Sequence, residues 1–152
     1  MTLKIILTKG QIDSLARFAN EALPNESCAF LLGSSGNSSI SEILLMKNAD
    51  SSPFTFSIAP SQLLEAYDVA EKRGLQVVGI FHSHPGKPLP SSTDKKYMEI
   101  NPVTWLIYST TEGTFGAYLS DGVVVKCDVI ITDWFCPYLE DTALHRAHSV
   151  GR

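Results

Sequence analysis

The residues with the clearest capacity for chemistry are two histidines and one aspartate. His82 and His84 are separated by one residue, Pro85 follows them, and Asp94 comes a short loop later. Side chains at i and i+2 of an extended strand point to the same side, and Pro85 favours an extended backbone at His84. Catalytic zinc sites usually combine three such ligands with a water in the fourth position. The spacing therefore predicts one Zn²⁺ ion per chain, bound by His82, His84 and Asp94.

Each of these residues can also be explained without a metal. A His-x-His pair alone is a weak signal for metal binding. Asp94 stands three residues after Ser91, which is the spacing of a helix capping box. Their position at the end of an apolar run, beside a loop with two prolines, favours the metal site. The residues alone leave both interpretations open.

Glu26 and Ser91 are candidates for the remaining chemistry of such a site. A water on zinc needs a general base that is not itself a ligand. Glu26 directly precedes an apolar run in which a carboxylate has no core role. Ser91 is placed to donate a hydrogen bond to the water or to an oxyanion. On spacing alone, a surface charge beyond a helix end explains Glu26 at least as well.

The surrounding pattern predicts a single α/β or α+β domain with a mixed sheet and two main helices. The apolar runs without alternation at residues 27–32 and 76–81 suit central strands covered on both faces, and the second of these runs delivers His82 at its carboxyl end. Further strands are expected at residues 3–7, 40–46, 103–108, 114–119 and 123–131, with a short extended piece at 54–58.

Three helices are expected between these strands. Thr8 and Gln11 have capping-box spacing, and Pro24 ends the helix that they open. Residues 60–74 predict a second helix, which is expected to bury Leu63, Leu64, Tyr67 and Ala70. A short third helix is expected from about residue 91 to residue 99, after the metal loop.

Length and sequence pattern predict one domain over residues 1–133, which carries the candidate site, followed by a surface helix or partly disordered tail at 134–152. The chain has 152 residues and a net charge of −4, with no Lys/Arg-rich run, which argues against nucleic acid. It has three cysteines without a framework spacing and no apolar run of membrane-spanning length. These features predict a cytoplasmic protein without a membrane partner.

Taken together, these residues resemble the JAMM (MPN+) zinc metalloprotease family, of the prokaryotic single-domain type. The segment from Pro24 to Gly33 resembles the glutamate-bearing strand of that family. His82-Ser83-His84-Pro85, Ser91 and Asp94 resemble its H-x-H-P…S-x-x-D signature. The resemblance covers about residues 1–132, and its joint motifs are specific. In one departure, the loop of residues 86–90 is one residue shorter than usual between proline and serine.

The resemblance implies a fold, a set of roles and a substrate. It implies an MPN-like sheet, His82, His84 and Asp94 as zinc ligands, Glu26 as general acid/base for a zinc-activated water, and Ser91 as a partner of the oxyanion or water. It also implies hydrolysis of the (iso)peptide bond after the C-terminal Gly-Gly of a ubiquitin-like modifier. The sequence does not indicate which modifier or linkage is cleaved, or the oligomeric state.

Two rival functions remain at this stage. A zinc hydrolase of another small peptide or amide substrate would use the same residues. A non-catalytic MPN scaffold would be expected to lack ligands, and here all are present. The zinc-dependent nucleobase deaminase pattern is absent, because no C-x-x-C pair exists.

Overall fold

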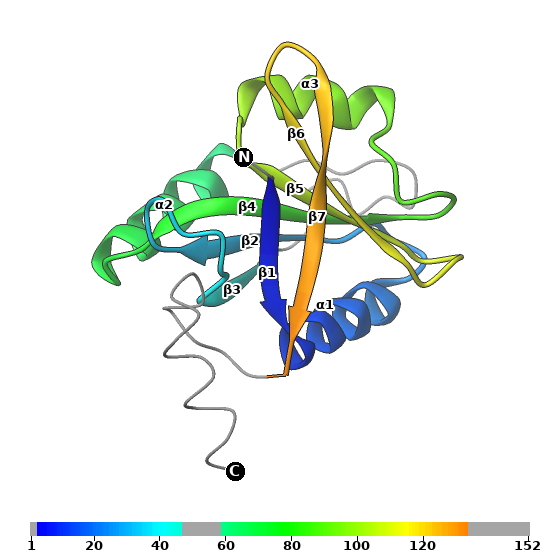
Figure 1. Ribbon diagram of the computed structural model, residues 1–152, viewed down its shortest axis with the longest axis horizontal. Coiled ribbons are helices and arrows are strands. Elements are labelled where there is room, and N and C mark those ends of the chain that lie inside the picture. Colours follow the sequence, from blue (N-terminus) through cyan, green and yellow to red (C-terminus); the bar gives the residue numbers. More distant parts are fainter. Residues whose placement is uncertain (1–2, 47–58, 134–152) are drawn as a thin grey trace.

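A computed structural model describes residues 3–46 and 59–133. In these residues seven strands form one mixed sheet in the order β1-β7-β6-β5-β4-β2-β3, with three helices around it (Figure 1). The strands are β1 (Lys4–Thr8), β2 (Cys28–Gly33), β3 (Glu42–Met46), β4 (Gln76–His84), β5 (Thr104–Ser109), β6 (Phe115–Ser120) and β7 (Val124–Thr132). The helices are α1 (Lys9–Ala22), α2 (Pro60–Lys72) and α3 (Ser92–Ile100). The predicted mixed α+β class is confirmed.

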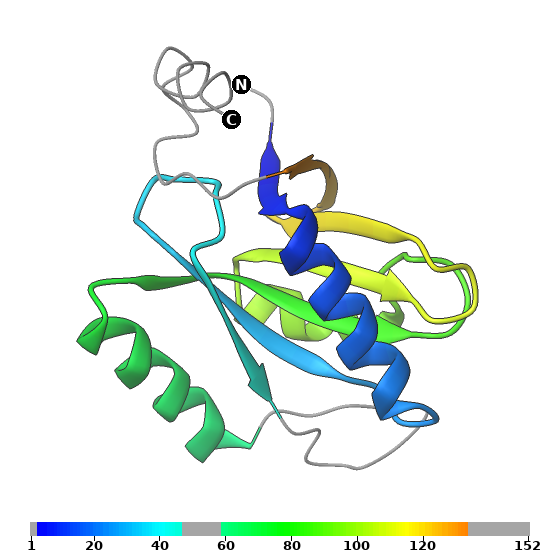
Figure 2. The same ribbon diagram turned by 90° about the horizontal axis from the view of Figure 1, so that it is seen from below.

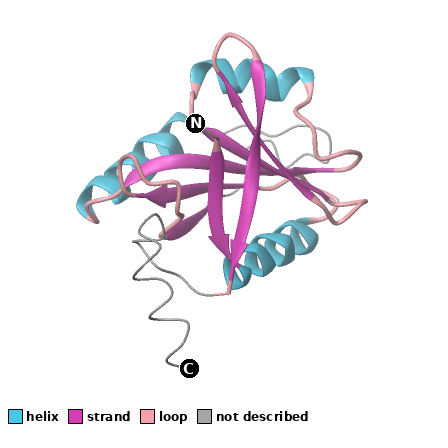
Figure 3. Cartoon of the chain, viewed as in Figure 1, coloured by secondary structure: helices cyan, strands magenta, loops and turns pink. Residues whose placement is uncertain are grey.

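The sheet is curled, so that its two ends point in different directions in Figure 1. The pairs β1/β7 and β4/β5 are parallel, and the other neighbouring pairs are antiparallel. At the β1 edge, Ile6 also forms a bridge to Ser39, which precedes β3. The helices lie around the strands rather than among them (Figure 3).

The central strands bury side chains on both faces of the sheet. Alternate residues of β2 and β5 belong to two separate core clusters. One cluster contains Ile12, Leu15 and Ala19 of α1, and the other contains residues of α2 and α3 (Figure 2). Coverage on both faces explains why β2, buried at every position, shows no alternation in sequence.

The expected burial of α2 is partly wrong. Leu64 is 72% exposed and Tyr67 is 48% exposed, whereas Ala66 and Ala70 are buried. Ala66 and Ala70 are four residues apart and share one helix face, and Leu63 packs against the same cluster. The small alanines let the helix approach the sheet closely, which turns Leu64 and Tyr67 outward.

The last strand also departs from simple alternation. Within β7 only Cys127 is fully buried, and Ile131, on the core-facing side, is 53% exposed. The hydrophobic core therefore does not extend to the carboxyl end of β7.

The extended piece expected at residues 54–58 and the tail at 134–152 lie outside the described residues. No helix in the described ranges is long and apolar enough to cross a membrane.

Candidate active site

The two histidines and the aspartate meet where β4 ends and α3 begins. His82 and His84 are on the strand, and Asp94 is in the first turn of the helix. The Nε2 atom of His82 is 3.2 Å from Asp94 Oδ1, and the Nε2 atom of His84 is 3.6 Å from Asp94 Oδ2. His82 and Asp94 are each 1% exposed. One ligand-type atom from each of the three residues lies within 4.8 Å of the others.

This donor set fits a zinc ion. Two ligand atoms on a tetrahedral zinc ion lie about 3.4 Å apart, given bonds of about 2.1 Å. The two His–Asp distances of 3.2 and 3.6 Å are close to that value. The Nδ1 atom of His84 is 2.9 Å from the Pro85 carbonyl, and its Nε2 atom is also 3.0 Å from the Leu89 carbonyl. With the proton on Nδ1, the unprotonated Nε2 faces the Leu89 carbonyl and the Asp94 carboxylate, an arrangement that suits a cation at that position.

Asp94 is both a member of this cluster and the third helical residue of the capping box that Ser91 opens. Its Oδ2 accepts the Ser91 N–H at 2.9 Å, while Ser91 Oγ accepts the Asp94 N–H at 3.1 Å. Burial alone would raise the pKa of Asp94, but the hydrogen bond and charge of His82, the Ser91 N–H and the charge of His84 together lower it. The two interpretations of Asp94 in the sequence are therefore compatible. The capping box fixes the carboxylate in front of the histidines.

Glu26 precedes β2 in the chain and approaches the same nitrogen of His82 as Asp94 does. Its side chain is only 8% exposed, and Oε1 is 3.6 Å from His82 Nε2. Burial, and then the negative charge of Asp94, raise the pKa of Glu26 to about 7. A carboxyl group that titrates near neutrality is suited to take up and return a proton. Glu26 is thus a buried residue of the cluster and not the exposed charge of the alternative explanation.

The loop between His84 and Ser91 is anchored on the β5–β6 hairpin. The Gly86 N–H donates to Thr111 Oγ1 at 2.9 Å, and Ser109 Oγ donates to the Gly86 carbonyl. Gly86 has a φ of 87°, which favours glycine. A Cβ atom on Gly116 of β6 would lie 2.6 Å from the Pro88 carbonyl oxygen. The short loop is therefore packed directly against the sheet.

Several supporting residues were not identified from the sequence. The Ser27 carbonyl lies 3.3 Å from His82 Nδ1, and Ser27 also contacts Ser83. Ser109 and Thr111 hold the loop. The available signal was the presence of small polar residues at the ends of apolar strands. Their partners depend on strand register, which a single sequence does not give.

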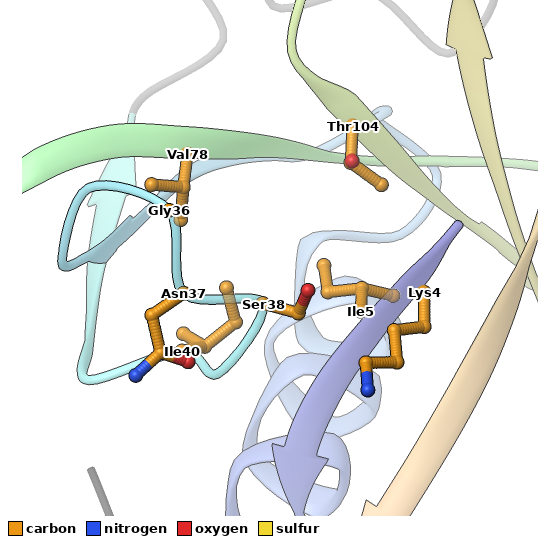
Figure 4. Close-up of a pocket in the computed structure, with 8 residues that line it drawn as sticks. All are labelled: Lys4, Ile5, Gly36, Asn37, Ser38, Ile40, Val78 and Thr104. Atoms are coloured by element: carbon orange, nitrogen blue, oxygen red, sulfur yellow. The ribbon is translucent and has the colours of Figure 1, made fainter. Parts of the chain in front are cut away.

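A separate cavity of about 280 Å³ lies beside β1, away from this cluster (Figure 4). Its walls include Lys4, Asn37 and Ser38, with Val78 early in β4 and Thr104 at the start of β5. His82 and His84 are at the opposite end of β4. The cavity is therefore not part of the candidate active site.

Comparison with known proteins gives the family. Residues 8–119 match the family model Prok-JAB, described as prokaryotic homologues of the JAB domain. The chain belongs to this family. The family resemblance inferred from the sequence motifs is confirmed. Every residue of the cluster lies inside the matched range of this Prok-JAB protein.

Two curated relatives are similar over part of their length. The chain is 37% identical over 95 residues to a protein named desampylase from Pyrococcus furiosus, covering 62% of this chain and 66% of the relative. It is 33% identical over 97 residues to a probable TtuB-protein conjugate cleaving protease from Thermus thermophilus, covering 62% of this chain and 64% of the relative. Each match therefore spans slightly less than two thirds of the relative.

Solved structures share the fold over most of the chain. A solution structure of a protein from Desulfitobacterium hafniense is 32% identical with a TM-score of 0.76, covering 86% of this chain and 94% of that one. A JAB1/MPN domain protein from Archaeoglobus fulgidus is 22% identical with a TM-score of 0.55, covering 83% and 99% of the two chains. At that identity the second likeness concerns the fold alone, and it agrees with the predicted MPN-like sheet.

Proposed function

We propose that this Prok-JAB protein is a zinc-dependent isopeptidase. Its substrates would be conjugates of a ubiquitin-like modifier, cleaved at the (iso)peptide bond after the modifier's C-terminal Gly-Gly. The names of the relatives, desampylase and conjugate cleaving protease, support a hydrolase of protein conjugates. The observation that carries the proposal is the buried Glu26 carboxyl group, 3.6 Å from His82 at the edge of a three-ligand cluster.

The residues of the cluster divide the chemistry among them. His82, His84 and Asp94 would hold the ion. A zinc ion held by them would act as a Lewis acid and lower the pKa of water. Glu26 takes a proton from the attacking water and returns it to the leaving amine. The raised pKa of Glu26, about 7, suits both transfers.

Ser91 has the hydrogen-bonding capacity for an oxyanion partner. Its Oγ already accepts the Asp94 N–H at 3.1 Å, so its own O–H is available to donate. The reciprocal bond from the Ser91 N–H to Asp94 holds the residue beside the cluster. A donor fixed before the reaction stabilises developing negative charge without reorganisation.

We place the reaction in the cytoplasm, since Cys28 and Cys127 are free thiols, as expected in a reducing compartment.

A metal assay coupled to cleavage of a panel of ubiquitin-like fusions tests the proposal. The purified protein should contain about one zinc ion per chain and cleave at least one fusion after Gly-Gly. Glu26→Gln should keep the zinc but lower kcat by about 10²- to 10⁴-fold. Glu99→Gln, an exposed change on α3, is the matched control. Zinc well below stoichiometric in folded protein, or full activity of Glu26→Gln, would contradict this assignment.

A further inference from the structure

Ser83, the residue between the two histidines, is completely buried although its side chain is polar. Its Oγ lies 3.0 Å from the backbone nitrogen of Ser27 and 2.6 Å from Ser27 Oγ. Ser27 is only 2% exposed, so neither hydroxyl group has ready access to water. Buried polar groups are normally retained for their hydrogen bonds. The contacts between Ser83 and Ser27 therefore provide hydrogen bonds to polar groups that water does not reach.

Ser27 directs its backbone and side-chain polar groups at residues 82 and 83. Its N–H donates to Ser83 Oγ, and its carbonyl accepts the Ser83 N–H at 3.1 Å. The same carbonyl lies 3.3 Å from His82 Nδ1. The regular ladder between β2 and β4 begins only at Cys28, opposite His82. These bonds thus extend the pairing of the two strands to the residue next to Glu26.

This arrangement fixes the two groups that face each other in the cluster. When His82 Nδ1 donates to the Ser27 carbonyl, the Nε2 lone pair is turned toward Glu26 and Asp94. Glu26 is covalently joined to Ser27, and its Oε1 is 3.6 Å from that nitrogen. We infer that Ser83 is a positioning residue: its hydroxyl holds Ser27, and through Ser27 it keeps the Glu26 carboxyl group against His82. The catalytic part of this inference rests on the proposed function.

Substitutions at residue 83 separate positioning from packing. Ser83→Ala removes the acceptor of a buried N–H, whereas Ser83→Thr keeps the hydroxyl group. A displacement of about 1 Å at a reacting group costs about 100-fold in rate. We expect Ser83→Ala to lower kcat about 10- to 100-fold, with KM within about twofold and an unchanged zinc content. Ser83→Thr should recover most of that loss. A fall in zinc content parallel to the fall in activity would overturn the inference.

A double-variant cycle shows whether Ser83 acts through Glu26. If it does, Ser83→Ala should cause no additional loss of kcat in a Glu26→Gln background, because the group it positions is already gone. Equal losses in both backgrounds would assign Ser83 a general structural role instead. If Ser83→Ala fails to fold, Ser27→Ala can replace it in the cycle. This variant removes the Ser27 hydroxyl group but keeps the bond from the backbone N–H of residue 27 to Ser83 Oγ. The same non-additivity is expected, with a smaller loss.

Hydrogen exchange in the metal-free protein tests the positioning without any activity. The amide of residue 83 donates to the Ser27 carbonyl, so its exchange reports whether Ser27 stays docked. In Ser83→Ala this exchange should accelerate at least about tenfold, while the amide of Ile107 in β5 stays protected. Unchanged protection of residue 83 would overturn the inference. If the wild-type protein cleaves no conjugate but the exchange changes as expected, the proposed function fails and the positioning role stands.

Discussion

At the level of single residues, Asp94 divides its two carboxylate oxygens between different partners. Oδ2 accepts the Ser91 N–H in the capping box, and Oδ1 faces His82. Asp94→Asn keeps an oxygen for the cap but removes the charge, so zinc affinity should fall at least about tenfold. The unfolding free energy of the metal-free protein should change by less than about 1 kcal/mol. Competitive zinc titration and urea denaturation measure the two quantities.

Asp94→Ala provides the comparison for that prediction. It removes the charge and also the side-chain oxygen that accepts the Ser91 N–H, while Ser91 Oγ can still accept the N–H of residue 94. A lost hydrogen bond of this kind costs about 0.5–1.5 kcal/mol. Metal-free Asp94→Ala should therefore be less stable than metal-free Asp94→Asn, while both bind zinc weakly. Equal stability of the two variants would mean that the bond from the Ser91 N–H to residue 94 contributes nothing to the stability of α3.

Glu26 should make the metal-free protein less stable as the pH rises. Its pKa is raised from 4.5 to about 7 in the folded chain, so the folded state binds more protons than the unfolded state between these values. The stability contribution of this group is therefore lost as the pH increases through that range. In chelator, Glu26→Gln should raise Tm relative to wild type at pH 8, and this difference should shrink toward pH 5. A pH-independent difference would contradict the raised pKa.

The types of the site residues were predictable from the sequence, but their supports were not. His82, His84 and Asp94 lie on one strand and the helix that follows, so their spacing carried the signal. Glu26 was a candidate only because it precedes an apolar run, and its burial next to His82 depends on the pairing of β2 with β4. The contacts of Ser27 with Ser83 depend on the register of that pairing, which no local pattern encodes.

At the level of elements, the packing of the short loop on β6 depends on Gly116. A Cβ atom there would lie 2.6 Å from the Pro88 carbonyl oxygen and 2.8 Å from Tyr118 Oη. Gly116→Ala should therefore displace the loop, lower stability by about 1–3 kcal/mol and weaken zinc binding through His84. Thermal unfolding and zinc titration measure these effects.

Gly10→Ala is the matched control for that substitution. The nearest atom to a Cβ on Gly10 of α1 is Thr8 Oγ1 at 3.8 Å, an ordinary contact. Alanine is favoured over glycine in helices by up to about 1 kcal/mol. Gly10→Ala should therefore leave zinc binding unchanged and preserve or raise stability. If Gly116→Ala left stability and zinc affinity as little changed as Gly10→Ala, the loop of residues 86–90 would not depend on its packing against Gly116.

Element types were more predictable than the faces they present. The capping box at Thr8 and Gln11 forms as expected, and β2 and β4 are central strands. The buried face of α2 was misassigned because Leu64 and Tyr67 carry much larger apolar side chains than Ala66, yet they are exposed and Ala66 is buried. Close approach of the helix to the sheet requires small residues, and this tertiary preference outweighs hydrophobicity at single positions.

At the level of the whole molecule, zinc should stabilise the folded chain. Its three expected ligands belong to β4 and α3, and a ligand that binds only the folded state at 100 times its Kd adds about 2.7 kcal/mol. Tm should therefore rise on adding Zn²⁺ to chelated protein. Mg²⁺, which prefers oxygen ligands and octahedral geometry, should have little effect. His84→Ala should abolish the zinc response, and a persisting response would place the ion elsewhere.

The position of the cluster in the chain has a consequence for the order of folding. The three expected ligands lie on one strand and the helix after it, so they are close together early, whereas the contacts between Ser27 and Ser83 join residues 56 apart in sequence. Contacts of long sequence separation form late because the intervening loop must first be closed. We expect the three local ligands of a nascent chain to be able to bind zinc while Glu26 is still distant. In the proposed hydrolase, metal binding would then come before catalytic activity, which would arise only when β2 pairs with β4 and brings Glu26 to His82.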